Sequence, residues 1–411
     1  MTRILISAGE ASGDLHAGAV TRAIKQLEPE AEVFGMGGDC LREAGGEVLF
    51  DIKEHSVMGF VEVLKRLPDI WKLRSAFIEL MDRRKPEVLL TIDYPGFNMR
   101  LAKLAKDRGI KVVSFIAPSA WAWRPSRAAG VVKVVDKIAS IFPFEYDLYK
   151  SYGADIEFVG HPLVDTVKPS LPCNEAEQLA GKRGGHPLIL LMPGSRTMEI
   201  QRLLPDMLAA AKLLKQKRPD IDFAMPRAVT IAREMLEGPV NGHRPGHGKI
   251  NIRAVTIARE MLEGPVKQAG LDIKLTEGHN YDVMSVADLA IATSGTVTLE
   301  AALCGLGCEI LYKASPISFW IAKQVVEIPN IGLPNIVAGR LIEPELLQDD
   351  CTPEKIAATA LELLEPERFA LLQRDLREVK KKLGEPGAVK RVAELVLRVA
   401  RQNRDRHLLP R

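Results

Sequence analysis

The stretch LILLMPGSRTMEIQRLLPDMLAAAKLL, residues 188 to 214, decides the fold because it joins a strand directly to a helix. The apolar run 188–192 predicts a buried strand, PGSR predicts a tight turn, and the apolar spacing that follows predicts an amphipathic helix. A helix that begins at a strand end presents free backbone N–H groups, and Ser195 and Arg196 stand beside them. The stretch therefore indicates an anion site suited to a diphosphate, although an ordinary strand-to-helix turn has the same pattern.

A second strand-to-helix junction lies further along the chain, where a strand over 288–292 runs into TSGTVTLEAALCG. Ser294, Gly295 and Thr296 place hydroxyl and N–H groups at the start of the helix. Glu300, one turn into that helix, offers a carboxylate for two ribose hydroxyls. Together with PGSR this pattern indicates a nucleotide site. The alternative is a helix capped by Ser and Thr, with an exposed Glu.

The chain also begins with a strand, a loop and a helix, and the loop reads SAGEASGD. Its glycines allow a ligand close to the backbone, while Glu10, Ser12 and Asp14 offer partners for sugar hydroxyls. The loop lacks the G-x-G-x-x-G pattern of dinucleotide-binding proteins. A simple capped turn explains the same residues almost as well.

Further polar and aromatic residues follow predicted strands in the first half of the chain. Asp93 comes after a strand over 87–92, and ligands of open α/β sheets bind beyond such strand ends. It is a candidate general base, or else a helix cap or turn residue. Trp121, in APSAWAWRPSR, suits a sugar or lipid headgroup but also ordinary packing. His161 precedes a proline and is interpreted as a hydrogen-bonded structural residue.

The segment HSVMGFVEVLKRLPDIWKLRSAFIELM, residues 55 to 81, combines large apolar groups with interspersed Lys and Arg. An apolar face with a basic rim suits an anionic membrane surface or acyl chains. Val57, Met58, Phe60 and Trp71 are its candidate membrane or acceptor contacts. A pair of helices packed against the core is the alternative.

One block of sequence is duplicated: RAVTIAREMLEGPV occupies 227–240 and again 253–266, with NGHRPGHGKINI between the copies. Two identical copies do not make a solenoid, which needs several diverged repeats. Only one copy fits the single helix position between neighbouring strands. We expect either copy to be able to dock there, the other remaining outside the core without a ligand.

Composition narrows the class of protein. The chain has 411 residues, of which 46% are hydrophobic, and a net charge of +3, which gives no general affinity for nucleic acid. An odd number of cysteines, five, suits a reducing compartment, and the sequence offers no carboxylate cluster typical of a metal site. No signal peptide or membrane span is evident, so a cytoplasmic location is expected.

Alternating strands and helices in two successive halves predict two Rossmann-like domains that face each other across a cleft. The expected domains are 1–168 and 186–345, separated by the Pro- and Gly-rich segment 169–185. Residues 352–402 are expected to form helices that pack back over both domains or against a second subunit. A homodimer through these C-terminal elements is thus one option.

A series of motifs, in chain order, resembles the lipid-A-disaccharide synthase family: SAGEASGD, SVMGFVEVL, IDYPGFN, PSAWAWR, FPFE, VGHP, PGSRTMEI, SGTVTLE, FWIAK and LPNIVAG. The resemblance spans nearly the whole chain and implies a GT-B type glycosyltransferase. It implies that UDP-2,3-diacylglucosamine is joined to 2,3-diacylglucosamine 1-phosphate in a β-1,6 linkage, with inversion and release of UDP. It also implies peripheral binding to the cytoplasmic face of the inner membrane of a Gram-negative bacterium, without a cofactor.

The resemblance assigns roles to particular residues. Asp93 is the expected base, with Glu10 as the alternative, and Arg196 stabilises the departing diphosphate. Glu300 holds the ribose, while Glu199 and Asn335 shape the donor pocket. Two other classes stay open, a UDP-sugar epimerase of the same fold and a noncatalytic lipid-binding protein. An NAD-dependent oxidoreductase is disfavoured because the glycine fingerprint is missing after the first strand.

Overall fold

A computed structural model describes residues 1–55, 67–123, 125–227, 262–315, 319, 324 and 328–408. The chain divides into two compact units. Unit 1 contains Met1–Asp165 and Leu383–Arg411, and unit 2 contains Thr166–Gln324 and Ile328–Lys382. Each is an α/β domain built on its own parallel sheet, as the sequence predicts.

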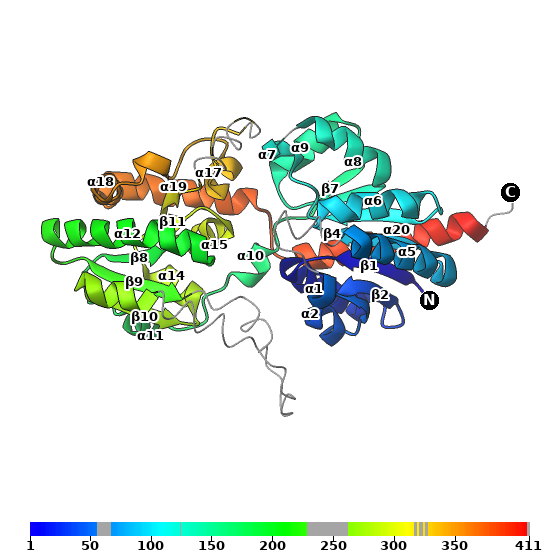
Figure 1. Cartoon of the computed structure of the whole chain (residues 1–411), viewed down its shortest axis with the longest axis horizontal. Helices are drawn as coiled ribbons and strands as arrows, with labels where there is room; N and C mark the ends of the chain where they lie inside the picture. The colour runs from blue at the N-terminus through cyan, green and yellow to red at the C-terminus, as the bar shows by residue number, and fades with distance from the viewer. Residues whose placement is uncertain are drawn as a thin grey trace, which may run out of the picture. The chain divides into compact units, whose positions relative to one another are not determined.

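Unit 1 holds a seven-stranded sheet in the order β3-β2-β1-β4-β5-β6-β7 (Figure 1). Neighbouring strands in this sheet pair in parallel. The order reverses between β1 and β4, which is the Rossmann topology and creates a ligand-binding switch point at their carboxyl ends. The strands are β1 Arg3–Ala8, β2 Glu32–Gly37, β3 Glu47–Asp51, β4 Val88–Ile92, β5 Lys111–Phe115, β6 Lys137–Ser140 and β7 Ile156–Phe158.

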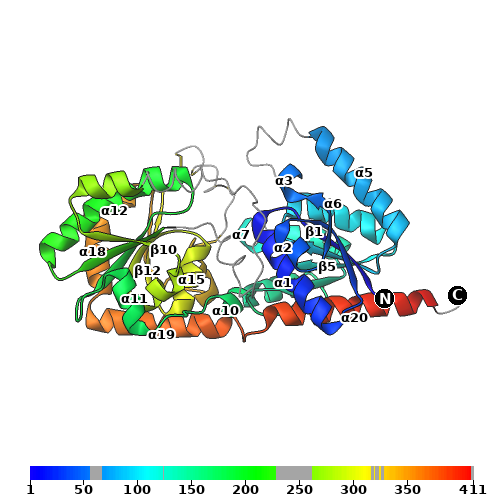
Figure 2. The same ribbon diagram turned by 90° about the horizontal axis from the view of Figure 1, so that it is seen from below.

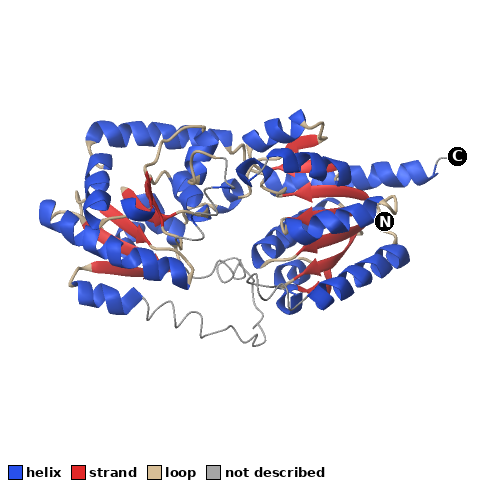
Figure 3. Ribbon diagram, turned by 45° about the horizontal axis from the view of Figure 1, so that its top comes forward, coloured by secondary structure: helices blue, strands red, loops and turns tan. Residues whose placement is uncertain are grey.

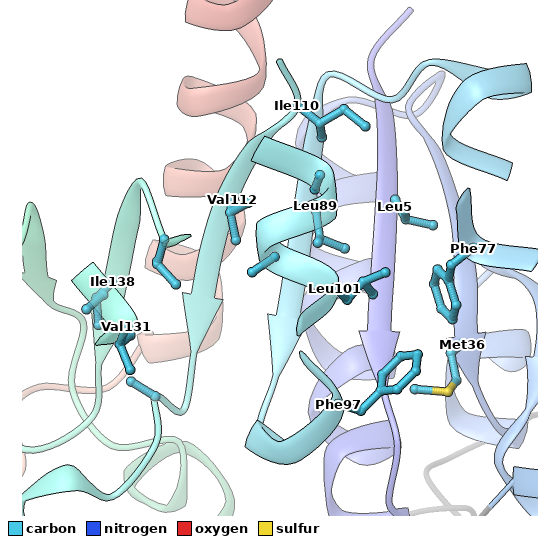
Figure 4. Packing of buried hydrophobic residues seen from close by; sticks show 14 of the residues in the cluster. Leu5, Met36, Phe77, Leu89, Phe97, Leu101, Ile110, Val112, Val131 and Ile138 are labelled. Atoms are coloured by element: carbon cyan, nitrogen blue, oxygen red, sulfur yellow. The ribbon is translucent and has the colours of Figure 1, made fainter. Parts of the chain in front are cut away.

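Helices cover both faces of this sheet. Successive strand side chains point to opposite faces, so Leu5 and Leu89 contribute to the core cluster drawn in Figure 4, beside Phe77 and Leu101. On the other face α20 packs on α1, β4 and β5 (Figure 2). The helices are α1 Ala11–Leu27, α2 Asp39–Glu43, α3 Ile52–His55, α5 Leu67–Arg84, α6 Pro95–Lys106, α7 Ala120–Trp123, α8 Ala128–Val134, α9 Pro143–Ser151, α10 Leu163–Thr166 and α20 Ala388–Leu408.

Unit 2 repeats the arrangement with a six-stranded sheet in the order β10-β9-β8-β11-β12-β13. All of its pairs are parallel too, and the order reverses between β8 and β11. The strands are β8 Leu188–Met192, β9 Asp222–Arg227, β10 Ile273–Glu277, β11 Leu289–Thr293, β12 Cys308–Tyr312 and β13 Glu345–Leu347. The stretch 188–214 thus supplies one strand of the switch point.

The sheet of unit 2 also lies between helices, which Figure 3 draws in blue beside the red strands. On one side α18 packs on α12, β11 and β12. The other side contains a cluster to which α11, α14 and α15 contribute Ala176, Val283 and Ala301. The helices are α11 Cys173–Ala180, α12 Thr197–Lys217, α14 Asn280–Val286, α15 Thr296–Cys304, α17 Leu333–Ala338, α18 Pro353–Leu363 and α19 Pro366–Lys382.

The division between the units lies just before the expected linker. It falls at Asp165, and the expected linker 169–185 instead carries α11 inside unit 2, because Ala176 and Ala180 give this polar segment an apolar face that is buried. The C-terminal helices are divided between the two units. Both α18 and α19 belong to unit 2, whereas α20 returns to unit 1.

The duplicated block is described only at its two ends. Strand β9 ends at Arg227, the first residue of the first copy. Residues 262–269 are helical, and within the second copy Leu262 and Val266 are buried. The second copy therefore provides the docked residues, whereas the sequence left open which copy would dock. The rest of both copies lies outside the described residues.

Candidate functional site

The two strand-to-helix junctions of unit 2 lie side by side. Strands β8 and β11 pair directly, with Met192 opposite Ala292. A Cβ atom on Gly194 would lie 3.2 Å from the Cγ2 atom of Thr293, so the turn that follows β8 packs against the end of β11. The structure thus brings together the candidate donor residues Ser195, Arg196, Glu199, Ser294, Gly295 and Thr296 at one switch point.

The PGSR turn is held by a carboxylate from its own helix. Glu199 Oε2 accepts hydrogen bonds from the backbone N–H groups of Ser195 (3.2 Å) and Arg196 (3.3 Å). The Arg196 guanidinium donates to Glu199 Oε1 over 3.1 Å, and its side chain is 82% exposed. A Cβ on Gly194 would meet Glu199 Oε2 at 2.5 Å, so a glycine is needed here. Glu199 thus occupies part of the anion site that the sequence predicts.

At the turn that follows β11, the first residues of the next helix are exposed to solvent. Gly295 and Thr296 are exposed at the N-terminus of α15, and the Ser294 hydroxyl donates to the Ile331 carbonyl over 3.2 Å. Glu300 lies one turn further along and is 9% exposed, so it differs from the solvated carboxylate of the alternative interpretation. Burial raises the pKa of Glu300 to about 7. Its carboxyl group can therefore accept or donate hydrogen bonds near neutral pH.

Asn335 is part of the scaffold behind this turn. It is fully buried on α17, and its Oδ1 atom accepts the N–H groups of Ile342 (2.8 Å) and Glu343 (2.9 Å). Its Nδ2 atom donates to Glu345, whose carboxylate also accepts from Ile331 and Gly332. Asn335 thus fixes the segment that bonds to Ser294, and a direct contact with a donor stays a prediction.

The switch point of unit 1 is held by a buried asparagine. Asn98 accepts from the Ser7 hydroxyl over 2.6 Å, which joins α6 to the end of β1. Its amide donates to the carbonyls of Ser7 (3.2 Å) and Asp93 (2.7 Å). These bonds span the ends of β1 and β4, so they fix the loops that carry Glu10 and Asp93.

Asp93 follows the end of β4 in a left-handed backbone conformation. The φ angles of Asp93 and Tyr94 are 48° and 50°, in the left-handed region where non-glycine residues are uncommon. Partial burial raises the pKa of the Asp93 carboxyl. The Tyr94 ring covers Gly9, where a Cβ would clash at 2.3 Å. Asp93, Tyr94 and the neighbouring Glu10, exposed at the start of α1, share this edge of the sheet.

Asp14 is bonded to backbone groups that follow the carboxyl end of β2. It is 4% exposed, and its carboxylate accepts the backbone N–H groups of Gly38 (2.6 Å), Cys40 (3.0 Å) and Leu41 (3.2 Å). The carboxylate therefore joins α1 to the start of α2, and its contact with an acceptor stays a prediction. Ser12 is exposed in the first turn of α1.

The membrane segment is described in part. Trp71 is 62% exposed on α5, with the Arg74 guanidinium 5.5 Å from the centre of its ring. An exposed indole with a basic neighbour has the character that the sequence predicts for a membrane contact. Val57, Met58 and Phe60 lie outside the described residues. No helix in the described part of the chain is both long enough and apolar enough to span a bilayer.

Two buried polar residues beside the strand ends were not singled out as site residues from the sequence. Glu145, in FPFE, is 3% exposed and accepts the Trp121 indole N–H over 3.1 Å. Burial raises the pKa of Glu145 to about 7. His161 is 7% exposed and accepts the Leu163 N–H, so its interpretation as a hydrogen-bonded structural residue is confirmed.

Within the described ranges no three His, Cys, Asp or Glu side chains gather as a metal site.

Solved structures share this architecture. UDP-GlcNAc 2-epimerase from Neisseria meningitidis, bound to UDP-GlcNAc, matches with a TM-score of 0.59 at 13% identity over 97% of this chain and 100% of that chain. MurG from Acinetobacter baumannii matches with a TM-score of 0.53 at 13% identity over 97% of this chain and 100% of that chain. At such identities the likeness concerns the fold alone. The fold is that of two-domain glycosyltransferases and epimerases.

Sequence comparison selects one family within that class. The lipid-A-disaccharide synthetase family model matches residues 4–245 and 247–399. Lipid-A-disaccharide synthase from Geobacter sulfurreducens is 39% identical over 396 residues, which cover 96% of each chain. The enzyme from Anaeromyxobacter dehalogenans is 40% identical over 97% of this chain and 98% of its own length. This chain belongs to the lipid-A-disaccharide synthase family, and the resemblance stated from the motifs is confirmed.

Proposed function

We propose that this chain transfers the diacylglucosaminyl group of UDP-2,3-diacylglucosamine to 2,3-diacylglucosamine 1-phosphate and releases UDP. The observation that carries the proposal is the family match over nearly the whole chain. The arrangement of unit 2 supports it, since two helix N-termini at one switch point suit a diphosphate. The epimerases match only at 13% identity, by fold, and therefore give the alternative much weaker support.

Asp93 is proposed as the general base of this transfer. The acceptor's 6-hydroxyl oxygen forms a bond to the anomeric carbon of the donor, and its proton passes to the Asp93 carboxylate. The bond between the anomeric carbon and the diphosphate oxygen breaks, and UDP leaves with the electron pair. A raised pKa makes Asp93 a stronger base than an exposed aspartate. Glu10, at the same edge of the sheet, is the alternative base.

Unit 2 supplies the positive potential that the leaving diphosphate needs. The Arg196 guanidinium and the N-termini of α12 and α15 are preorganised for negative charge. Glu199 accepts hydrogen bonds from the backbone N–H groups of the same turn, so a diphosphate must displace it or share them. Glu300 is proposed to bind the ribose hydroxyls.

Because both proposed substrates carry acyl chains, we expect the enzyme to bind a membrane surface. We place the contact on the segment around Trp71, together with Val57, Met58 and Phe60, on an anionic inner-membrane surface at the cytoplasmic side. The exposed indole of Trp71 and its basic neighbour support this placement. Dimer formation through C-terminal elements is tested by light scattering of the intact chain.

The experiment that tests the function measures UDP release with purified donor and acceptor. We expect UDP only when both substrates are present, together with a disaccharide 1-phosphate product detected by mass spectrometry. Conversion of the donor sugar in the absence of acceptor would instead identify an epimerase. Failure to form the disaccharide from both substrates would reject the proposed function.

A further inference from the structure

The segment 116–121, which comprises the connection after β5 and the start of α7, lies beside Asp93. Strand β5 pairs with β4, with Phe115 opposite Ile92. The Asp93 N–H donates to the Phe115 carbonyl over 3.3 Å. A change in the backbone at Ile116 is therefore transmitted to the residue that follows β4.

This segment starts with a strained residue. Ile116 has a φ angle of 57°, which is rare for a β-branched side chain. Asp93 and Tyr94, across the strand pair, have left-handed φ angles as well. Such conformations persist only where the surrounding structure enforces them, and they concentrate at functional sites. The residues with left-handed φ angles thus follow directly after two paired strands, β4 and β5.

Helix α9 supplies the bonds that hold the segment. Tyr149 is fully buried, and its hydroxyl donates to the Pro118 carbonyl over 2.6 Å. Glu145, one turn earlier on the same helix face, accepts the Trp121 indole N–H over 3.1 Å. Its second oxygen accepts the Ile141 N–H over 3.3 Å, which fixes the carboxylate at the start of the helix.

The held segment presents groups that suit a sugar. The Trp121 ring lies 4.9 Å from Phe144 between ring centres, and both rings are only partly buried. Aromatic faces pack well on the apolar faces of sugar rings. Ser119 is the exposed polar side chain of the segment and follows Pro118 directly.

We propose that Glu145 and Tyr149 are positioning residues that clamp segment 116–121 as part of the acceptor-sugar binding surface. The inference rests on the proposed function and extends it, because it assigns the acceptor's sugar ring to the same sheet edge as Asp93. Neither residue contacts the reacting atoms in this assignment. They act through the backbone at Pro118 and the ring of Trp121.

The kinetic test uses Tyr149→Phe, which removes a single hydroxyl group. Loss of that hydrogen bond should raise the KM for the acceptor by about fivefold to tenfold, with a donor KM unchanged within about twofold because the donor residues lie in unit 2. Tyr146→Phe, on the same helix, is the matched control, because the Tyr146 hydroxyl makes no hydrogen bond among the described residues. Both KM values of this control variant should stay at wild-type levels. Equal changes in both KM values of Tyr149→Phe, or no change, would overturn the inference.

A binding test separates this inference from the proposed chemistry. Protein labelled with 5-fluorotryptophan is titrated with 2,3-diacylglucosamine 1-phosphate, and the ¹⁹F resonance of Trp121 is assigned with Trp121→Phe. The resonance should shift with the acceptor, remain unchanged with UDP alone, and start from a different position in Glu145→Gln. A wild-type protein that shows the shift but forms no disaccharide would refute the proposed function alone. An active wild type without the shift would refute the clamp.

Discussion

The duplicated block allows a substitution test in which the two sites have the same local sequence. Leu262 is 4% exposed in the helix that leads into β10, whereas Leu236 occupies the equivalent position of the first copy. Parallel neighbours such as β9 and β10 need a crossover, and the helical residues 262–269 lie within this one. Because Leu262 fills the buried position, Leu236 cannot fill it as well.

Replacement of a buried leucine by alanine costs roughly 2–5 kcal/mol. A loss of about 3 kcal/mol corresponds to a fall of roughly 6–12 °C in the unfolding temperature of a domain of this size. We expect this fall for Leu262→Ala and a change below about 2 °C for Leu236→Ala, because one buried position holds only one of the two leucines. Differential scanning calorimetry measures both, and Leu190→Ala, in the core of the same unit, identifies the transition of unit 2.

Equal falls for the two variants would show that both leucines stabilise the fold, and an unaffected Leu262→Ala would refute a required docking of the second copy, because the intact first copy could then take its place. Removal of residues 241–266 leaves one intact copy between the same strands. Loop-closure entropy changes by only about 0.6 kcal/mol for each doubling of loop length. The shortened chain should therefore keep its unfolding temperature within a few degrees and retain its activity.

Four other changes have defined outcomes. Asp93→Asn should lower kcat by roughly 10²- to 10⁴-fold in the UDP-release assay and leave UDP affinity unchanged, because an amide cannot take the acceptor's proton; activity within a few-fold of wild type would exclude Asp93 as the base. Arg196→Ala should weaken UDP binding on the order of tenfold in calorimetry, and equal affinity would remove its role at the diphosphate. Replacing Phe60 and Trp71 by Ser should reduce sedimentation with anionic vesicles, whereas unchanged binding by a folded variant would place the anchor elsewhere. Burial lowers the pKa of His161 to about 3, so the unfolded state binds more protons between pH 6.5 and 3 and stability falls on acidification. Between pH 7 and 5 the wild type should lose roughly 2 kcal/mol more than His161→Gln, and an imidazole that titrates near pH 6.5 by NMR would contradict this.

Local sequence patterns were sufficient for the strands and turns that form the two switch points. The apolar runs before Asp93, PGSR and SGT each predicted a strand, and the structure places β4, β8 and β11 there. The strands β2 and β3 were not singled out, because Glu32–Gly37 and Glu47–Asp51 mix apolar residues with glycines and charges. Their place at one sheet edge depends on pairing with β1, which a local pattern does not encode.

The roles of single polar residues were less accessible from the sequence. Asp14 and Asn335 have the chemistry of ligand-binding groups, yet their partners are backbone groups at Gly38 and Ile342. A partner 24 residues away, as for Asp14, is brought close only by the fold. The strain at Ile116 is equally invisible in a sequence, since a β-branched residue after a strand predicts extended backbone. The site could thus be located, but its internal bonding could not be derived.

The return of α20 to unit 1 has a consequence for synthesis on the ribosome. Strands β1 to β7 emerge first, but the helix that packs on β4 and β5 is made last, after all of unit 2. Its inner residues, including Val392 and Val396, are fully buried in the finished protein. The part of the sheet face on which α20 packs therefore lacks this helix until α20 has been made. Unit 2 can complete its fold before unit 1, and a fragment that stops at Asp165 lacks the helix that shields its own sheet.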